Sequence, residues 1–360
     1  MSGATGPRRI AALAGALEQD GIDALLVTHL PNIRYLTGFS GSAGLLLVRA
    51  AGTMLITDFR YAVQAPLEAP GVEVQIDPVS IWDRVGRVLG QRPLERLGVE
   101  SHVLTTRDAE RLSRLTRAQV VSTSDVVERF RAAKDPQEVA SIRAAASLAQ
   151  EALAEVLPSV RAGERELDVA ARLESALRRR GSEWHPFPTI VASGPRAALP
   201  HARTTAREIQ PNELLLIDFG AQLDGYCSDL TRTMVVGRAD DRQRTIHGLV
   251  QEAQVRARTQ VRAQMTGREA DSLARDVIAA RGFGEAFGHS LGHGLGLEVH
   301  EAPRLSQTNE IALPLHAVVT IEPGIYLPGW GGVRLEDDVY LGPGGPELLS
   351  DGRTDLLELH

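Results

Sequence analysis

The sequence is almost without cysteine, since Cys227 is the only one among 360 residues. A single thiol cannot form a disulfide within the chain, and this usage fits a reducing compartment, so we expect a cytoplasmic protein. Long apolar runs are also missing: none approaches the ~20 residues that span a bilayer, and we expect no membrane partner. The apolar stretch near the N-terminus is interrupted by Glu18 and Asp20, which predicts an amphipathic helix rather than a signal peptide.

Sustained runs of basic residues are absent as well. The formal net charge is -7, whereas a nucleic-acid-binding domain usually carries a basic patch, so we expect no nucleic-acid partner. The chain is 43% hydrophobic and 24% charged, which is the balance of an ordinary globular protein.

Length and pattern together predict two domains, 1–131 and 132–360. A chain of 360 residues exceeds what one core usually supports. Up to about residue 125, strand-like apolar runs alternate with helical periodicity, and residues 45–57 predict a hairpin, so the first domain is expected to be α/β. The charged stretch 128–137 contains an Asp-Pro pair, which predicts a connection and the start of a helix.

The second domain begins with two predicted helices and then changes character. Residues 138–160 are alanine-rich and amphipathic, and a further helical pattern over 166–181 ends at a glycine. Beyond it the chain is rich in glycine, strand patterns and histidine, and eight of the ten histidines follow residue 180. This asymmetry predicts that the chemistry lies in the second domain.

Two aspartates lie on the arms of a predicted hairpin at 214–236. Apolar strands flank Asp224-Gly225, a strong turn signal. A two-residue loop there makes Asp229 the diagonal neighbour of Asp218, and a four-residue loop places the two directly opposite. Both registers put the carboxylates on one face, whereas a three-residue loop would separate them. Two buried carboxylates on one face repel unless they share a proton or hold a cation, although exposed surface residues would need neither.

A second segment, 318–341, repeats this arrangement. Glu322 and Glu336 lie symmetrically about Gly329 in the sequence, so an odd loop centred there places them opposite each other. Arg334 precedes Glu336 by two residues and therefore shares its face. The repetition makes a pair of surface hairpins a much weaker explanation.

Residues 288–303, GHSLGHGLGLEVHEAP, hold His289, His293 and His300. The glycines oppose a stable helix and permit close backbone approach. Three histidines beside two carboxylate hairpins favour a site over isolated structural roles. Four carboxylates and one imidazole form an oxygen-rich set with enough charge for two divalent ions, first Mn²⁺, with Co²⁺ or Zn²⁺ as alternatives. Such a pair can activate a water for attack on a carbonyl.

These segments resemble the pita-bread metallopeptidases, which include methionine aminopeptidase, Xaa-Pro aminopeptidase and prolidase. The matching sequence motifs are IDFG, SDLTRT, GHG, IEPG and VRLED. The resemblance implies five metal ligands, namely Asp218, Asp229, His293, Glu322 and Glu336. In that family Asp229 and Glu336 would bridge the metals, and Glu322 would also act as general base. The resemblance further implies catalytic or pocket-lining roles for His201, His289, His300 and Arg334.

Two N-terminal segments resemble the creatinase-like domain of Xaa-Pro aminopeptidases and prolidases, namely PNIRYLTGFSGSAG and TDFRYAVQA. The resemblance therefore implies a creatinase-like α/β domain followed by an α+β pita-bread catalytic domain. It implies an Xaa-Pro aminopeptidase that removes the first residue of peptides with proline in second position, acting as a homodimer. Prolidase activity restricted to dipeptides is the alternative, ahead of a metal-free creatinase-like hydrolase and a non-catalytic binding protein.

Several other residues are expected to have structural or peripheral roles. Cys227 lies between the carboxylate strands and is expected to be a small packed residue. His29 and His102 are expected to be structural or exposed. Residues considered for the cleft mouth, the pocket wall or a neighbouring subunit's site are His185, Trp184, Trp330, Tyr35, Arg60 and Tyr61.

Overall fold

The computed structural model describes residues 5–91, 94–350 and 353–360. The chain divides into two compact units, Met1–Arg131 and Ala132–His360. Within the described ranges, no helix combines the length and the apolar character needed to cross a membrane.

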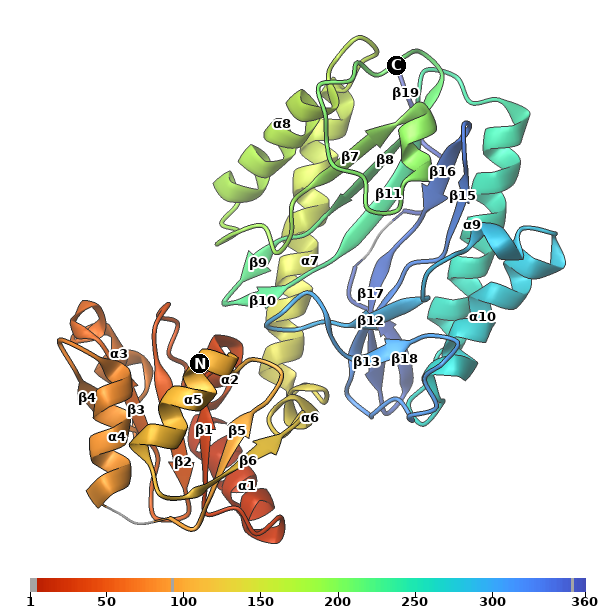
Figure 1. The fold of residues 1–360 in the computed structure, drawn as a ribbon. Helices are drawn as coiled ribbons and strands as arrows, with labels where there is room; N and C mark the ends of the chain where they lie inside the picture. The colour runs from red at the N-terminus through yellow and green to blue at the C-terminus, as the bar shows by residue number, and fades with distance from the viewer. Residues whose placement is uncertain (1–4, 92–93, 351–352) are drawn as a thin grey trace. The chain divides into compact units, whose positions relative to one another are not determined.

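The N-terminal unit is a six-stranded mixed sheet with helices beside it (Figure 1). The strand order is β4-β3-β2-β1-β5-β6. Antiparallel pairing joins β1 to β2 and β2 to β3, whereas β1, β5 and β6 run parallel. The strands are β1 (Ala24–Val27), β2 (Leu45–Arg49), β3 (Met54–Thr57), β4 (Glu73–Ile76), β5 (Arg96–Glu100) and β6 (Gln119–Thr123). The helices are α1 (Thr5–Gln19), α2 (Leu30–Thr37), α3 (Gln64–Glu68), α4 (Ile81–Gln91), α5 (Thr106–Leu115) and α6 (Glu128–Arg131).

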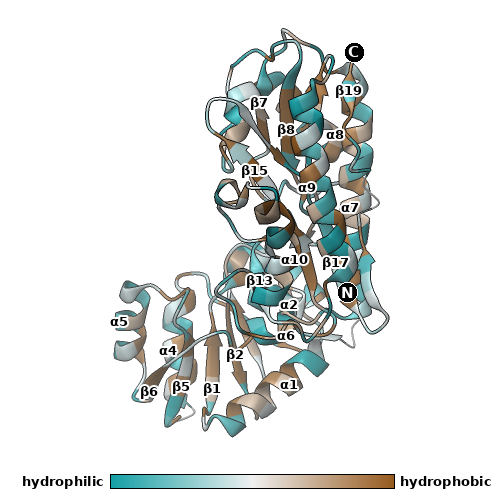
Figure 2. Ribbon diagram, turned by 90° about the vertical axis from the view of Figure 1, so that its right-hand side faces the viewer, coloured by the Kyte–Doolittle hydropathy of each residue, from teal (hydrophilic) through white to brown (hydrophobic). Residues whose placement is uncertain are grey.

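Sequence pattern explains this sheet directly. Strands β1, β2 and β3 are buried along their whole length, which suits their continuous apolar runs. The predicted hairpin of residues 45–57 is confirmed, with Leu46 opposite Leu55. Figure 2 shows the strands β1 and β2 in brown, and teal segments on helices α4 and α5.

The C-terminal unit repeats an order of two helices followed by strands. Helices α7 (Pro136–Val156) and α8 (Glu166–Arg179) precede the first set of strands, and α9 (Asp241–Gln260) and α10 (Gly267–Ala280) precede the second. The first set is β7 (Ile190–Ser193), β8 (Glu213–Phe219), β9 (Gln222–Leu223), β10 (Tyr226–Cys227) and β11 (Leu230–Val236). The second set is β12 (Gly292–Gly294), β13 (Glu301–Leu305), β14 (Val318–Ile321), β15 (Gly324–Leu327), β16 (Gly331–Arg334), β17 (Asp337–Gly342) and β18 (Gly345–Leu348), with β19 (Glu358–Leu359) near the C-terminus.

These strands form two main sheets, of order β19-β11-β8-β7 and β13-β12-β14-β17-β18, and two small ribbons, β15-β16 and β9-β10. The helix predicted after residue 137 starts with a capping box, in which the Asp135 side chain accepts from the amide of Glu138 and the Glu138 side chain accepts from the amide of Asp135. Helices α7 and α8 share one apolar core with β8 and β11.

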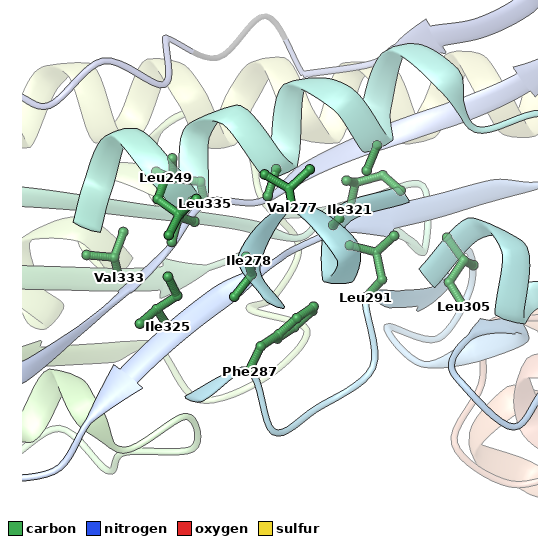
Figure 3. Close-up of a cluster of buried hydrophobic side chains, with 14 of the residues drawn as sticks. Leu249, Val277, Ile278, Phe287, Leu291, Leu305, Ile321, Ile325, Val333 and Leu335 are labelled. Atoms are coloured by element: carbon green, nitrogen blue, oxygen red, sulfur yellow. The ribbon is translucent and has the colours of Figure 1, made fainter. Parts of the chain in front are cut away.

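Helices α9 and α10 form a second core against β14, β15 and β16 (Figure 3). Ile321, Val333 and Leu335 point into this core. Since neighbouring residues of an extended chain face opposite ways, their neighbours Glu322, Arg334 and Glu336 are directed away from it, toward the centre described next.

Candidate metal centre

The first carboxylate hairpin has the two-residue register. Asp218 lies opposite Thr231, and Tyr226 opposite Leu223. Asp224 and Gly225 have φ values of 51° and 81°, which is the left-handed conformation that a two-residue hairpin loop requires at both positions. The same register carries Asp229 to the face of Asp218, so one of the two registers predicted to bring them together is the one observed.

The second carboxylate hairpin also has its predicted register. Gly324 pairs with Arg334, and Ile321 pairs with Asp337. Both pairs are symmetric about Gly329, whose φ is 78°. Glu322 and Glu336 therefore lie opposite each other where β14 passes into β15 and β16 into β17.

The two hairpins and β12 converge on one buried centre. His293 Nε2 lies 3.7 Å from Asp229 Oδ2 and 3.4 Å from Glu322 Oε1. Ligand atoms of Asp229, His293 and Glu336 all lie within 4.8 Å of one another. Asp218 joins this group through Arg334, whose Nη2 donates to Asp218 Oδ2 at 2.5 Å. Since these side chains come from separate strands and strand junctions, only the folded sheets assemble the set.

Burial makes the carboxylates of this centre difficult to ionise together. Burial raises the pKa of Asp229 well above its usual range, and the charges of Glu336 and Asp218 raise it further. Burial also raises the pKa of Glu336 well above its usual range, with Glu322 and Asp218 adding to the rise. Glu322 has its pKa raised to about 7, first by burial, while the charge of Arg334 opposes the rise. A positively charged ligand would remove this electrostatic strain.

Two carboxylate oxygens of the centre have no hydrogen-bond partner in the described residues. These atoms are Asp218 Oδ1 and Asp229 Oδ1, and both are buried. An unpaired buried carboxylate oxygen is costly unless a cation meets it. Oxygen-rich sets of this kind suit hard or borderline divalent ions, so the residues present fit a pair of divalent metal ions.

His293 presents one nitrogen to the carboxylates because the other is engaged. Its Nδ1 lies 3.0 Å from the carbonyl oxygen of Gly294, which can only accept a hydrogen bond, so Nδ1 carries the proton and Nε2 its lone pair. Burial lowers the pKa of His293, which favours this neutral, ligating form.

A layer of hydrogen bonds holds the carboxylates in place. Thr231 Oγ1 donates to Glu336 Oε2 at 2.6 Å, and Thr320 Oγ1 donates to Glu322 Oε1 at 3.1 Å. The Asp229 amide donates to Asp338 Oδ2 at 3.2 Å. Sequence reasoning did not assign roles to Thr320 and Asp338. Asp338 could have been found, because it lies two residues beyond Glu336 and alternation gives both the same face.

The remaining predicted residues lie around the centre at different distances from it. The His300 ring is exposed, with its centroid 4.4 Å from that of His293. His289 instead contacts Tyr326, with Nε2 2.8 Å from the hydroxyl, and burial lowers its pKa to about 4. His201 is exposed, and its charge lowers the pKa of His289, His300 and Glu322, which places it within electrostatic reach of all three.

Tyr326 is a residue that sequence reasoning missed. Its hydroxyl accepts a hydrogen bond from Arg334 Nη1 at 2.8 Å, and burial raises its pKa to about 12. It therefore links Arg334 to His289. A buried tyrosine opposite Gly332 on a short ribbon has no pattern in the sequence that separates it from a core aromatic residue.

Other expectations can be compared with the structure. Cys227 is buried and burial raises its pKa to about 12, which confirms a packed residue and opposes a nucleophilic one. Trp184 is exposed and stacks on the ring of His185. Trp330 is partly buried against the core of α9 and α10. His29 and His102 meet in the N-terminal unit beside Glu128.

Two family models match the chain. Metallopeptidase family M24 matches residues 140–343, and the Creatinase/Prolidase N-terminal domain matches residues 9–133.

Named proteins of known sequence or structure are also similar. The chain is 35% identical to a Pyrococcus horikoshii protein named Xaa-Pro dipeptidase, over 95% of this chain and 96% of that one. The solved Xaa-Pro dipeptidase from Bacillus anthracis has a TM-score of 0.96 at 39% identity, covering 98% of this chain and 100% of the other. The X-Pro aminopeptidase from Thermotoga maritima has a TM-score of 0.90 at 36% identity, covering 97% and 99%.

Proposed function

Because this chain belongs to metallopeptidase family M24 and carries a creatinase/prolidase N-terminal domain, we propose that it hydrolyses the bond between a peptide's first residue and a following proline. One observation carries the proposal: the four carboxylates and His293 share a single buried centre. Support for proline comes from relatives similar over nearly the whole chain whose names specify Xaa-Pro substrates.

We assign the metal ligands as Asp218, Asp229, His293, Glu322 and Glu336. Two divalent ions bound among these residues would supply a Lewis acid and lower the pKa of water toward neutrality. Manganese is proposed first because four carboxylates and one imidazole make a mostly hard ligand set, and cobalt and zinc are the alternatives. Four carboxylates beside a single guanidinium leave the centre negatively charged, in agreement with a need for cations.

Glu322 is the proposed general base. A general base must lie within reach of the proton that it removes, and Glu322 lies in the centre, with its Oε1 3.4 Å from His293 Nε2. Thr320 donates to its Oε1, which fixes the orientation of the carboxylate. The side chain can therefore take a proton from the attacking water and pass it to the leaving nitrogen.

Arg334 and the histidines are assigned supporting roles. Arg334 donates to Asp218 and to Tyr326, so it orients one metal-binding carboxylate. Partial loss of hydration lowers the pKa of His300, and deeper burial lowers that of His289, so the neutral form of both rings is favoured at pH 7. A neutral imidazole can donate one hydrogen bond to an oxyanion, which suits His300 beside His293. We propose that His201 contacts the substrate and that His289 lines the substrate pocket.

Substrate length is the finer part of the proposal. The two N-terminal sequence segments favour an Xaa-Pro aminopeptidase, and similarity to the Thermotoga maritima protein named X-Pro aminopeptidase supports that activity. Dipeptides are supported by the Pyrococcus horikoshii and Bacillus anthracis proteins, both named Xaa-Pro dipeptidase. We place the dipeptidase activity first, because more of these similar proteins carry that name, and keep the aminopeptidase as the second candidate.

A length series of substrates tests both candidates. The manganese-loaded protein is incubated with an Xaa-Pro dipeptide, an Xaa-Pro tripeptide, an Xaa-Pro pentapeptide and an Xaa-Ala dipeptide, and the products are identified by mass. Cleavage of the dipeptide alone supports the dipeptidase, and release of the first residue from all three Xaa-Pro peptides supports the aminopeptidase. Failure to cleave any of the Xaa-Pro peptides contradicts the proposal.

A pair of glutamate variants ties the activity to the centre. Glu322→Gln should lose almost all turnover, since an amide cannot accept the proton. Glu310→Gln, at an exposed glutamate paired with Arg268, should keep full turnover. Equal activities in the two variants would remove Glu322 from its role.

A homodimer and a cytoplasmic location remain predictions drawn from the sequence. Size-exclusion chromatography with light scattering checks the first, and a mass of one chain near 38.8 kDa would contradict it.

A further inference from the structure

Three side chains of the N-terminal unit converge although they are far apart in the sequence. One ring nitrogen of His29, one of His102 and a carboxylate oxygen of Glu128 all lie within 4.8 Å of one another. Glu128 Oε1 lies 3.1 Å from His102 Nε2 and 3.9 Å from His29 Nδ1. Two ligand atoms on one tetrahedral ion, each about 2.0–2.1 Å from it, are roughly 3.3 Å apart. The observed separations lie on either side of this value.

The topology of the sheet explains the convergence. His29 follows β1, His102 follows β5, and Glu128 lies beyond β6. Strands β1, β5 and β6 are neighbours and parallel, so their carboxyl ends share one edge. The chain passes from β1 to β2 on one side of the sheet and from β5 to β6 on the other, so the order of strands reverses between β1 and β5. In open α/β sheets, ligands bind outside the carboxyl ends of the strands at such a reversal.

Buried polar groups hold the side chain of Glu128 and the backbone of His29. Asn32 Nδ2 donates to Glu128 Oε1 at 2.5 Å and to Glu100 Oε1 at 2.6 Å. Arg131 Nη1 donates to Asn32 Oδ1 at 2.7 Å, which orients the amide. Glu100 Oε2 accepts from the backbone amide of His29 at 2.8 Å. Hydrogen bonds to the ligating residues are the usual means by which proteins hold metal ligands in position.

The cluster is partly enclosed and has one open side. The side chains of His29 and Glu128 are each 18% exposed, and that of His102 is 38% exposed. Glu128 Oε2 is buried and has no hydrogen-bond partner in the described part of the chain. An ion could enter beside His102, and water could fill the coordination position left by three protein ligands.

We propose that His29, His102 and Glu128 form a further cation site, selective for a borderline transition-metal ion such as Zn²⁺. Two imidazoles and one carboxylate are an established zinc ligand set. The set differs from the catalytic centre, where carboxylates outnumber imidazoles and harder ions are favoured. A bound ion would tie the ends of β1 and β5 to α6 and stabilise the N-terminal unit by mass action.

Equilibrium dialysis of the full-length protein against Zn²⁺ tests the proposal. The wild type should bind one zinc ion per chain more than His102→Ala or Glu128→Gln. Loss of a hydrogen bond that orients a metal ligand typically lowers metal affinity by roughly 10–100-fold. Loss of a ligand itself should therefore lower the zinc affinity of the further site by at least about 100-fold. Glu128→Gln keeps an oxygen that can accept from Asn32, so it controls for loss of folding.

Two further variants separate this site from the catalytic centre. Asp229→Asn should lose zinc at the catalytic centre and keep the further ion. His316→Ala, at a histidine that contacts Tyr340 in the C-terminal unit, should match the wild type. The proposal fails if the wild type binds no more zinc than His102→Ala and Glu128→Gln. It also fails if zinc raises the melting temperature of these two variants as much as that of the wild type.

Discussion

Thr231 shows how a single hydroxyl can order the metal centre. Its Oγ1 donates to Glu336 Oε2 at 2.6 Å and accepts from Arg334 Nε at 3.1 Å. The hydroxyl therefore lies between a proposed metal ligand and the guanidinium that holds Asp218. At the scale of single residues, the centre depends on such neighbours as well as on its ligands.

Thr231→Val should lower manganese affinity by roughly 10–100-fold, because it removes a hydrogen bond that orients a ligand and keeps the side-chain shape. Titration of activity and of bound metal with Mn²⁺ measures the change. Thr189→Val is the matched control, since the Thr189 hydroxyl is buried with no hydrogen-bond partner in the described residues. Equal affinities in the two variants would show that the Thr231 contact has no such role.

His300→Ala should keep both metals and slow the reaction. The ring is exposed and adjacent to His293, and we have placed no metal on it. Loss of one donor to an oxyanion typically lowers kcat by roughly 100-fold. Steady-state kinetics with metal analysis checks this result. A variant that loses metal, or that keeps its kcat, contradicts the assignment.

His247 on α9 should make the protein less stable in acid. It is buried, and burial lowers its pKa to about 4 from 6.5, partly opposed by a hydrogen bond with the Thr233 backbone. Between these two values the unfolded chain binds a proton that the folded chain does not. Stability is therefore complete above pH 6.5 and falls as the pH drops toward 4, by about 2 kcal/mol between pH 7 and pH 5.

Urea unfolding of the metal-free protein at pH 7 and pH 5 measures this loss. His247→Gln carries no titrating ring, so its unfolding free energy should fall by about 2 kcal/mol less than that of the wild type over the same pH interval. Identical losses in both proteins would assign the acid sensitivity to other groups.

At the scale of elements, the short strand β12 places His293 because glycine lets it approach its neighbours closely. A Cβ at Gly292 would lie 2.0 Å from the carbonyl oxygen of Thr320 on β14, whereas a Cβ at Gly288 would meet nothing within 4 Å. Close approach therefore requires glycine at the first position but not at the second.

Gly292→Ala should push β12 away from β14 and carry His293 with it. We expect a loss of about 1–3 kcal/mol in stability and at least a roughly tenfold fall in metal affinity, since the ligand moves from its position. Gly288→Ala, in the loop before β12, should match the wild type in both. The measurements are urea unfolding and manganese titration, and an unchanged Gly292→Ala protein would contradict this account of β12.

At the scale of the whole molecule, the metal ions should act as part of the structure. Without cations, Arg334 can balance only part of the charge of Asp218, Asp229, Glu322 and Glu336. Burying unbalanced charges destabilises a fold, and a ligand present at 100 times its dissociation constant stabilises one by about 2.7 kcal/mol.

Chelation should therefore lower the melting temperature of the manganese-loaded wild type by several degrees. Asp229→Asn lacks a ligand, so chelator should change its melting temperature much less. Thermal melts of both proteins, with and without chelator, make the comparison. A wild type that melts at the same temperature in chelator would show that the ions contribute nothing to stability.

Much of this arrangement could be predicted from local sequence. Asp224-Gly225 predicts a tight turn because few other residue pairs tolerate two left-handed conformations, and the symmetry of Glu322 and Glu336 about Gly329 predicts their pairing. The structure has the two-residue loop at Asp224-Gly225 in the first hairpin and the pairing centred on Gly329 in the second. The family is shown by the two model matches, in agreement with the resemblance of the motifs.

The sequence by itself determined the turns, the alternation of core and site residues and the family, because each depends on residues a few positions apart. Only the tertiary structure decided between the two- and four-residue registers of the first hairpin, and only it brought Thr231 and Tyr326 to the centre. It also joined His29, His102 and Glu128, which sequence reasoning had set aside as structural or had not considered. These contacts depend on which strands become neighbours, and that outcome is set by the packing of the whole core rather than by any local pattern.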